Sequence, residues 1–196
     1  MELFDKLKNY NVILASASER RRQLLEELGI DFEVIVKPFN ESFPDNLQGE
    51  QIAEYIAAEK AKMFINDVRP NEIIITADTI VLLDNKILGK PTNKADALRI
   101  LREISGKTHE VITGVSILYY NKAVTFSDTT KVTFRKMTDD ELYYYIDKYS
   151  PYDKAGAYGI QEWIGIAACS RIEGSFYNVM GLPVEKVYDK LCEIVL

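Results

Sequence analysis

The sequence predicts an α/β protein that forms a single domain over residues 1–196. Short apolar runs typical of strands alternate along the chain with segments in which leucine, isoleucine and phenylalanine recur at helical spacing. Hydrophobic residues make up 47% of the 196 positions, so the chain can bury a full core, and its length suits one domain with room for two lobes. No linker, internal repeat or low-complexity run is visible.

The first predicted strand and helix enclose a candidate anion site. Residues 12–14 form an apolar run typical of a buried strand, and leucines at helical spacing continue to Gly29, a usual helix stop. The helix start between them offers a partial positive charge, hydroxyls and guanidinium groups to an anion. Because three successive helical arginines cannot all face one ligand, we expect the phosphate-binding residues to be Ser16, Ser18, Arg20 and Arg21.

An ordinary capped helix would also account for this segment. Ser16 and Glu19 match the S-x-x-E capping box, and the arginines would then simply be solvated. Three cations at a helix N-terminus oppose the helix dipole, however, and such a local inconsistency tends to mark a functional site. We therefore favour the anion site.

The next elements carry one acidic and one basic candidate. A strand over residues 32–36 leads into a loop over residues 37–47 that contains Glu41, and a helix follows over residues 49–64. Lys60 lies in the same row of that helix as the apolar residues Ile52, Ile56 and Phe64. A lysine on an apolar stripe usually extends its ammonium to solvent, and the functional alternative is that Lys60 reaches the phosphates.

Residues 73–83 form an almost continuous apolar run typical of a central strand. Asp78 and Thr79 interrupt it, and burying a carboxylate is costly unless it is paired, binds a metal or opens into a cleft. We favour a catalytic role for Asp78 over structural pairing. After a turn, Lys90 precedes a predicted helix over residues 94–104 and could reach the same cleft.

Two signatures after this helix indicate structure rather than chemistry. The triplet Gly106-Lys107-Thr108 lacks the first glycine of a P-loop and ends a helix, so Gly106 is better explained as a helix C-cap. His109 has only Glu110 nearby as an orienting carboxylate, which favours a structural or surface role over that of a general base.

The C-terminal half predicts a β-hairpin, with strands over residues 111–120 and 123–134 joined around Asn121 and Lys122. A capping box at residues 138–141 then opens a helix. The tyrosines of this helix suit packing and a partner surface, so the sequence permits a homodimer.

A glycine-containing loop, a strand and a last helix complete the chain. The loop over residues 151–161 combines small residues with a lysine, an acid and an amide, which favours a binding surface over a purely structural turn. A strand is predicted over residues 163–169 and a turn over residues 173–175. Pro183 suits the first position of the last helix, whose start is a second candidate anion site.

Composition and charge exclude several classes of protein. The formal net charge of −6 argues against general nucleic-acid binding, whereas a basic segment on an acidic chain suits a small polyanion such as a nucleotide. Cys169, Cys192 and the single histidine are too few for a zinc site, and reduced thiols fit a cytoplasm best. No apolar stretch could cross a bilayer and no signal peptide is visible, so we expect a soluble cytoplasmic protein.

Seven short segments between Leu14 and Pro183 are distinctive as a set. They are, in order, LASASERR, AEKA, ADTIV, LGKP, ISGKTH, DKAGAYGIQ and NVMGLP, and together they cover most of the chain. On this set the sequence resembles the Maf family of nucleotide pyrophosphatases, which is also linked to septum formation in bacteria. The resemblance implies an α/β fold related to the inosine triphosphate pyrophosphatases, with an elongated mixed β-sheet flanked by helices and two lobes around a cleft.

The resemblance also implies a reaction and the residues for it. The reaction is hydrolysis of a nucleoside triphosphate to the monophosphate and pyrophosphate with a divalent metal, Mg²⁺, Mn²⁺ or Co²⁺. Asp78 matches the proposed general base, and the polar groups implicated around phosphate and metal are Arg21, Lys60, Lys90 and Glu41. Asp78 and Glu41 would be the metal ligands. The positions that set base specificity match Arg20, Thr79 and Gln161, a trio carried by the branch that prefers dTTP and UTP.

Three positions depart from the family pattern. The family usually has proline in place of Glu19, an acid in place of Asn40 and often glycine in place of Glu162. Two other functions stay open at this stage. One is a pyrophosphatase that sanitises 7-methyl-GTP or other modified nucleotides, and the other is a nucleotide-binding regulator of cell division without catalysis.

Overall fold

The structure is a computed structural model that describes residues 2–120 and 122–196. Its strands are β1 (Asn11–Leu14), β2 (Glu33–Val34), β3 (Glu72–Leu83), β4 (Lys86–Ile87), β5 (Thr108–Tyr119), β6 (Lys122–Phe134) and β7 (Cys169–Glu173). Its helices are α1 (Glu2–Leu7), α2 (Glu19–Glu27), α3 (Glu50–Lys62), α4 (Lys94–Ile104), α5 (Asp139–Tyr149), the 3₁₀ turn η1 (Ala155–Ala157), α6 (Trp163–Ala168), α7 (Phe176–Met180) and α8 (Val184–Val195).

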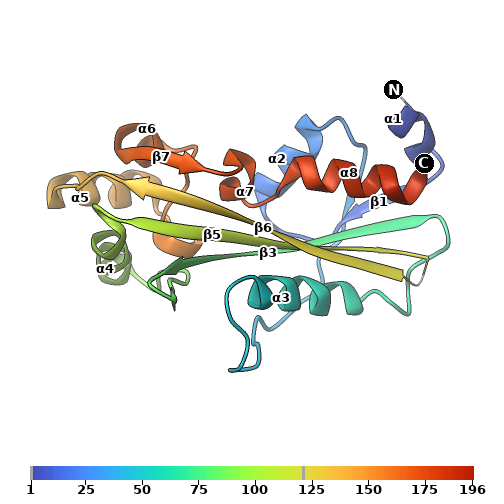
Figure 1. Ribbon diagram of the computed structural model, residues 1–196, viewed down its shortest axis with the longest axis horizontal. Helices are drawn as coiled ribbons and strands as arrows, with labels where there is room; N and C mark the ends of the chain where they lie inside the picture. Colours follow the sequence, from blue (N-terminus) through green and yellow to red (C-terminus); the bar gives the residue numbers. More distant parts are fainter. Residues whose placement is uncertain (1, 121) are drawn as a thin grey trace. The chain divides into compact units, whose positions relative to one another are not determined.

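Within the described ranges the strands form one sheet of seven, in the order β2-β1-β3-β5-β6-β7 with β4 paired to β3 (Figure 1). The sheet is mixed, because β1 runs parallel to both β2 and β3 whereas β4 is antiparallel to β3 and β7 is antiparallel to β6. Strand β3 lies inside the sheet and is buried along nearly its whole length, as its continuous apolar run predicts. The predicted α/β class and mixed sheet are confirmed, and the implied cleft stays a prediction.

The chain divides into two compact units. Unit 1 consists of Met1–Asp78, Thr113–Asp128 and Gly181–Leu196, and unit 2 consists of Thr79–Ile112 and Thr129–Met180. Strands β3, β5 and β6 each contribute residues to both units. The single domain expected over residues 1–196 stays a prediction beside this division into two units.

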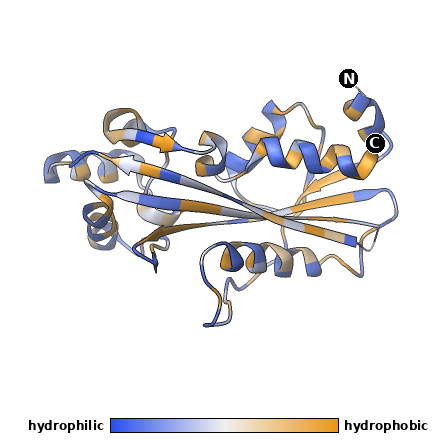
Figure 2. Cartoon of the chain, in the orientation of Figure 1, coloured by the Kyte–Doolittle hydropathy of each residue, from blue (hydrophilic) through white to orange (hydrophobic). Residues whose placement is uncertain are grey.

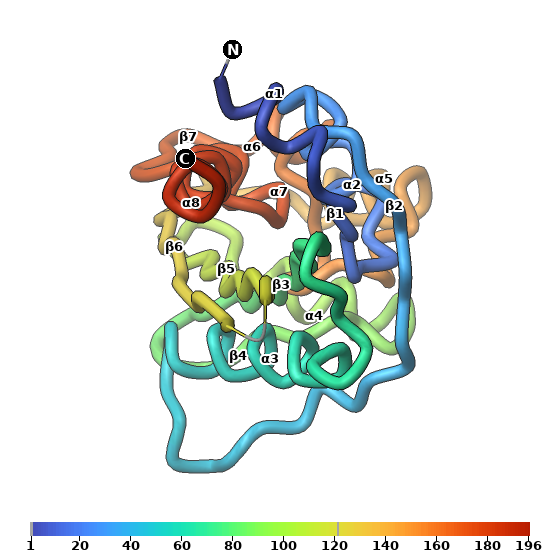
Figure 3. Tube along the Cα trace, turned by 90° about the vertical axis from the view of Figure 1, so that its right-hand side faces the viewer, coloured from blue at the N-terminus to red at the C-terminus, as the bar shows by residue number. Residues whose placement is uncertain are grey.

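Unit 1 packs helices on both faces of its strands. Figures 1 and 3 show α3 on one face and α8 on the other. The core under α3 joins β1, β3 and β5 to the helix through Ile13, Ile74, Leu118, Ala61 and Phe64, all at most 5% exposed. Figure 2 shows β3 largely in hydrophobic colours, whereas α3 and α8 carry both hydrophobic and hydrophilic residues.

Unit 2 contains an aromatic cluster and a pair of packed helices. His109, Phe134 and Tyr158 meet edge to face with ring centroids 4.9–5.4 Å apart. Helix α4 packs against α5 and η1, and Arg102 of α4 forms an ion pair with Asp139 of α5 at 2.7 Å. The capping box predicted at the start of α5 is confirmed, since Thr138 and Glu141 bond each other's backbone N–H groups.

Two of the predicted strands are wrong in type or extent. Residues 163–169 were expected to form a strand, but residues 163–168 form helix α6 and the strand β7 begins only at Cys169. The buried positions of α6 are Ile164 and Ala168, a helical spacing of four that a short apolar run does not distinguish from a strand. The strand expected over residues 32–36 is reduced to β2, a short edge strand whose side chains are exposed.

Several element ends also differ from expectation. Ser18, not Ser16, caps α2, and its hydroxyl accepts the Arg21 backbone N–H. Pro183 lies at the cap before α8 instead of inside its first turn, and helices α1 and α7 have no counterpart among the sequence predictions. Gly106 was expected to be the C-cap of α4, but Ser105 takes that position and Gly106, with φ +75°, follows it. Of the predicted hairpin turn, Asn121 lies outside the described residues.

Candidate functional site

The candidate site of unit 1 is built around Asp78, the last residue of that unit on β3. Asp78 is only 7% exposed, and its carboxylate Oδ1 accepts a hydrogen bond from Lys60 Nζ at 2.7 Å. The same ammonium donates to Glu41 Oε1 at 2.9 Å. Helix α3 positions Lys60 in its last turn, and the loop before α3 supplies Glu41. The structure thus brings to Lys60 two carboxylates, of Asp78 and Glu41, that are 18 and 19 positions away from it in sequence.

The pairing of Lys60 changes the interpretation of its helix position. An ammonium on an apolar stripe was expected to extend to solvent unless it served the site. Instead, the Lys60 side chain is 16% exposed and its ammonium lies between two carboxylates. Asp78 is therefore paired, and the buried carboxylate has the compensation that its strand position requires.

Arg21 connects three separate segments of unit 1. Its Nε donates to the Gly181 carbonyl at 2.8 Å, and its Nη1 donates to the Ala77 carbonyl at 2.9 Å and to Ser16 Oγ at 3.2 Å. The guanidinium thereby joins the start of α2 to β3, next to Asp78, and to the segment before α8. Three of its N–H groups serve the protein itself, so binding of phosphate by Arg21 stays a prediction.

The other predicted phosphate-binding residues lie at the same helix start. Ser16 Oγ accepts the Ser18 backbone N–H at 3.3 Å, and Arg20 is half-buried in the first turn of α2. Arg22, which was not assigned to the ligand, is exposed and pairs with Glu26 at 2.9 Å and Glu19 at 3.7 Å. Glu19 thus pairs with a solvated arginine, and no capping box with Ser16 forms.

Burial and charge act against each other in this cluster. Burial raises the pKa of the Asp78 carboxyl, and the Lys60 and Arg21 cations partly offset that rise. Burial likewise lowers the pKa of the Arg21 guanidinium, against the attraction of the Asp78 carboxylate. A buried base with adjacent cations is the kind of environment in which functional carboxylates occur.

Unit 2 carries Thr79, Lys90 and Gln161. Thr79 follows Asp78 on β3, and Lys90 is exposed in the loop after β4. The backbone N–H of Gly156 donates to the Leu88 carbonyl at 2.9 Å and to the Gly89 carbonyl at 3.2 Å. These bonds hold the loop of Lys90 against the predicted binding loop of residues 151–161, so the structure brings these two segments together.

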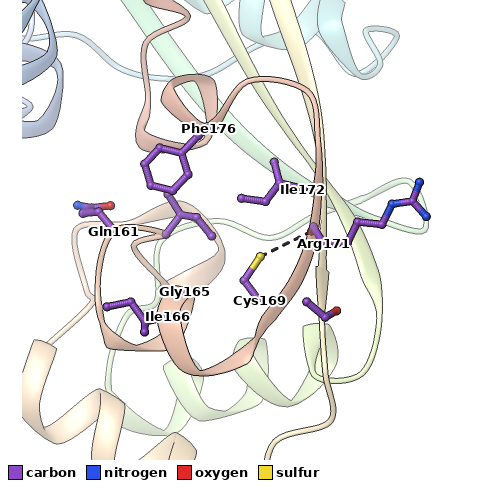
Figure 4. Close-up of a pocket in the computed structure, with 9 residues that line it drawn as sticks. Gln161, Gly165, Ile166, Cys169, Arg171, Ile172 and Phe176 are labelled. Atoms are coloured by element: carbon purple, nitrogen blue, oxygen red, sulfur yellow. Dashed lines mark hydrogen bonds between the residues drawn. The ribbon is translucent and has the colours of Figure 1, made fainter.

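A groove of about 530 Å³ adjoins Gln161 in unit 2 (Figure 4). Ile160, Ile172 and Phe176 supply apolar walls, and Ile166, which is 82% exposed, lies at its edge. Figure 4 shows the Phe176 ring near Gln161, whereas the Arg171 side chain extends away from both. An open groove that is lined by apolar side chains together with polar ones such as Gln161 suits a small planar molecule that carries polar edges.

His109 has the structural role expected of it. It is 1% exposed, and its Nε2 lies 2.7 Å from the Tyr158 hydroxyl in a hydrogen bond. Desolvation lowers the pKa of His109 to about 4, so the imidazole is neutral at neutral pH. It belongs to the core of unit 2 and not to the surface.

Two absences hold for the described part of the chain. No helix there is long and apolar enough to cross a membrane. No group of three or more histidine, cysteine, aspartate and glutamate side chains is arranged there to hold a metal ion. Glu41 and Asp78 are nevertheless brought to the same Lys60 ammonium, and their role as metal ligands stays a prediction.

Comparison with known proteins places the chain in a family. The sequence model of the family described as "Maf-like protein" matches residues 11–194. The chain belongs to this family. The match runs through both units and includes every candidate site residue of this Maf-like chain.

Curated bacterial relatives are similar to this Maf-like protein over nearly its whole length. It is 50% identical over 190 residues to the dTTP/UTP pyrophosphatase of Phocaeicola vulgatus, which covers 96% of this chain and 98% of that protein. It is 47% identical over 193 residues to the dTTP/UTP pyrophosphatase of Flavobacterium johnsoniae, which covers 98% of this chain and 100% of that protein. The resemblance to the Maf family is confirmed.

Solved structures with other sequences overlap only part of the fold. The nucleoside-triphosphatase, a dITP/XTP pyrophosphatase, of Mycobacterium abscessus covers 63% of this chain and 72% of its own length, with a TM-score of 0.38 and 14% identity. The Ham1 protein of Staphylococcus aureus gives a TM-score of 0.39. Such overlap supports no conclusion, so the relation to inosine triphosphate pyrophosphatases stays a prediction.

Proposed function

We propose that this protein is a nucleoside triphosphate pyrophosphatase that hydrolyses dTTP and UTP to the monophosphate and pyrophosphate. The observation that carries the proposal is the Lys60 cluster, which consists of Lys60, Asp78 and Glu41. Asp78 is buried on a central strand, and the Lys60 ammonium donates hydrogen bonds to its carboxylate and to that of Glu41. The curated relatives named dTTP/UTP pyrophosphatase support the choice of substrate. Residues 1–196 then work as one enzyme domain, supported by a family match that spans both units.

In this proposal Asp78 orients the attacking water and accepts its proton. The water oxygen attacks the α-phosphorus, the bond to the bridging oxygen breaks, and pyrophosphate leaves. Lys60 keeps the Asp78 carboxylate in place and adds positive charge near the developing negative charge. Lys90 and the hydroxyls and arginines at the start of α2 bind the phosphates, supported by the donors that a helix N-terminus presents.

The carboxylate pair fits a divalent metal of the hard class. Magnesium is commonly held by one or two carboxylates together with substrate phosphates, and Glu41 and Asp78 supply two carboxylates. Mg²⁺, Mn²⁺ or Co²⁺ bound there would neutralise charge on the triphosphate. The asparagine at position 40 offers no charged ligand, so Glu41 takes that role.

Base selection is assigned to Arg20, Thr79 and Gln161. Uracil and thymine share an O4 acceptor and an N3–H donor, and a single glutamine amide can pair with both atoms. Cytosine reverses that pattern, and a site built for such pairing can reject the wrong base by roughly 10⁴. The exposed position of Gln161 beside a groove with apolar walls supports its role as the reader of the base.

The decisive experiment measures pyrophosphate release by the purified protein with Mg²⁺ across dTTP, UTP, CTP, dITP and 7-methyl-GTP. We expect release from dTTP and UTP, with kcat/KM for CTP lower by roughly 10⁴-fold. Release confined to 7-methyl-GTP would replace the proposed substrate by a modified purine nucleotide. No release with Mg²⁺, Mn²⁺ or Co²⁺, together with nucleotide-dependent stabilisation, would replace the enzyme by a nucleotide-binding regulator.

Asp78→Asn tests the chemistry within this function. Removing the base should lower kcat by about 10²–10⁴-fold, because the amide cannot accept the proton of the water. Asp84→Asn is the matched control, since Asp84 is exposed in the turn after β3 and its left-handed backbone, with φ 51°, suits asparagine. Unchanged circular dichroism in both variants separates catalysis from folding, and full activity of Asp78→Asn would end the proposed role.

The proposal also covers the cellular location, the oligomeric state and the biological role of the enzyme. It acts in the cytoplasm, where free nucleoside triphosphates are available, and it needs no nucleic acid. A homodimer stays a prediction supported by the exposed Tyr143 and Tyr144 of α5, whereas Tyr145 on the same helix is buried. Removal of modified pyrimidine nucleotides and a link to cell division arrest stay predictions from the family resemblance.

A further inference from the structure

Gln161 is exposed in a segment whose neighbours are not. Ile160 before it is 4% exposed, and Gly159 and Tyr158 are also buried. The amide of Gln161 is therefore presented by a backbone that the unit 2 core restrains. How that backbone is held on the other side of Gln161 depends on Glu162, where this sequence departs from the usual glycine of its family.

Glu162 occupies the cap position of α6, yet its side chain forms no cap bond with that helix. Its carboxylate points into unit 2 instead. Oε2 accepts a hydrogen bond from the Tyr145 hydroxyl, and Oε1 lies 3.3 Å from Lys154 Nζ in an ion pair. Lys154 is itself buried, with a side chain 10% exposed, so this is an interior pairing of opposite charges.

The Tyr145 hydroxyl links both sides of Gln161. It donates to Glu162, the residue after Gln161, and accepts the backbone N–H of Gly159, two residues before it, at 3.0 Å. Tyr145 is fully buried on α5 and stacks on Tyr149 with ring centroids 5.1 Å apart. One rigid aromatic side chain thus clamps the chain on either side of an exposed glutamine.

Close packing leaves this clamp little freedom. A Cβ added at Gly159 would lie 2.8 Å from the Glu162 carboxyl carbon, so the carboxylate fills the space over that glycine. The backbone is held as well, because the Gly159 carbonyl oxygen accepts a hydrogen bond from the Glu162 N–H at 3.0 Å. The arrangement restrains the backbone at Gln161 more than a glycine at position 162 would.

We propose that Glu162, through Tyr145 and Lys154, is a positioning residue for base selection, because it fixes the backbone that presents Gln161. The proposal rests on the function proposed above, in which Gln161 reads the base. A recognition group rejects the wrong partner strongly only if it cannot shift to satisfy it, and supporting bonds around the group supply that rigidity. A glutamine on a loosened segment would pair less firmly with the uracil edge and so lose the advantage that it gives UTP over CTP.

The test compares kcat/KM for UTP with kcat/KM for CTP in the wild type and in five variants, the fifth being Gln161→Ala. Tyr145→Phe removes one hydroxyl and keeps the ring, and Glu162→Ala removes the carboxylate. The double variant tests whether both act through one clamp, and Tyr143→Phe is the matched control, because Tyr143 is exposed on the same helix. Tyr145→Phe and Glu162→Ala should each lower the UTP-to-CTP ratio by about tenfold, mainly by raising KM for UTP, with kcat/KM for CTP little changed, and Tyr143→Phe should keep the wild-type ratio.

The double variant should lose no more discrimination than the more affected single variant, since the two groups form one bond. Thermal unfolding checks that each variant is folded at the assay temperature. A folded Glu162→Ala with the wild-type ratio would overturn the inference and leave the proposed function intact, and so would equal losses for both nucleotides. A wild-type ratio in Gln161→Ala would overturn the role of Gln161 as the base reader and, with it, this inference. No turnover of UTP by the wild type would overturn the proposed function and the inference together.

Discussion

Arg21 shows how one side chain can matter for catalysis through the geometry it imposes. Its guanidinium donates to the carbonyls of Ala77 and Gly181 and to the Ser16 hydroxyl, so it fixes the backbone next to Asp78. A planar fork with donors at fixed angles makes these bonds together, whereas the single ammonium of lysine reaches fewer of them. The charge at this position is therefore less important than the shape of the group that carries it.

Arg21→Lys is expected to lower kcat/KM for UTP by about 10²-fold, because a small displacement of Asp78 spoils the alignment of the attacking water. Arg22→Lys is the matched control one position along, where the arginine is 51% exposed and pairs with Glu19 and Glu26 of its own helix. Steady-state kinetics of the two variants give the comparison. Equal activity of Arg21→Lys and the wild type would contradict the positional role.

At the scale of elements, the contact of α3 with β5 positions Lys60 relative to Asp78. Gly114 of β5 lies against the backbone of Ala53 in α3, so closely that an added Cβ would be 2.2 Å from the Ala53 carbonyl carbon. The helix that carries Lys60 can approach the sheet only because this strand position has no side chain. The distance of 2.7 Å between Lys60 and Asp78 depends on that approach.

Gly114→Ala is expected to destabilise the protein by about 3 kcal/mol, because the methyl group meets backbone rather than a flexible side chain. The displaced helix should also lower turnover in any variant that still folds. Gly89→Ala serves as the stability control, since nothing lies within 4 Å of a Cβ at that position. Urea unfolding of both proteins tests the prediction, and a Gly114→Ala midpoint equal to that of the wild type would refute the packing argument.

At the scale of the whole molecule, the burial of His109 makes folding sensitive to acid. Its pKa is about 4 in the folded protein, against an ordinary value of 6.5. Between these two pH values the unfolded chain binds a proton that the folded protein does not. The contribution of His109 to the free energy of unfolding is therefore present above pH 6.5 and is lost as the pH falls towards 4. A buried neutral imidazole thus makes the folded protein less stable in acid.

From pH 7 to pH 5, His109 should remove about 2 kcal/mol from the free energy of unfolding. The measurement is urea unfolding at both pH values for the wild type and for His109→Gln, which cannot titrate and can still bond the Tyr158 hydroxyl. The variant should lose about 2 kcal/mol less than the wild type over this interval. Identical losses would assign the acid sensitivity to other groups.

The sequence alone is enough for the features that depend on neighbours along the chain. Alternation of apolar runs predicts the longer strands and helices in order, the capping box places the start of α5, and the interruption of an apolar strand singles out Asp78. These signals follow from the repeats of helix and strand, which act over a few residues. The motifs around Lys60, Lys90 and Gln161 likewise identify the Maf family without any knowledge of contacts.

The tertiary structure alone decides which hydrogen-bond and ion-pair partners these residues have. No local pattern could indicate that Arg21 bonds the carbonyls of Ala77 and Gly181, or that Glu162 meets Tyr145 and Lys154 instead of capping α6. The short segment 163–168 becomes a helix because the core buries Ile164 and Ala168 together. Partners of this kind lie far apart in sequence, and a hydrogen bond near 3 Å exists only where the packed fold brings donor and acceptor together.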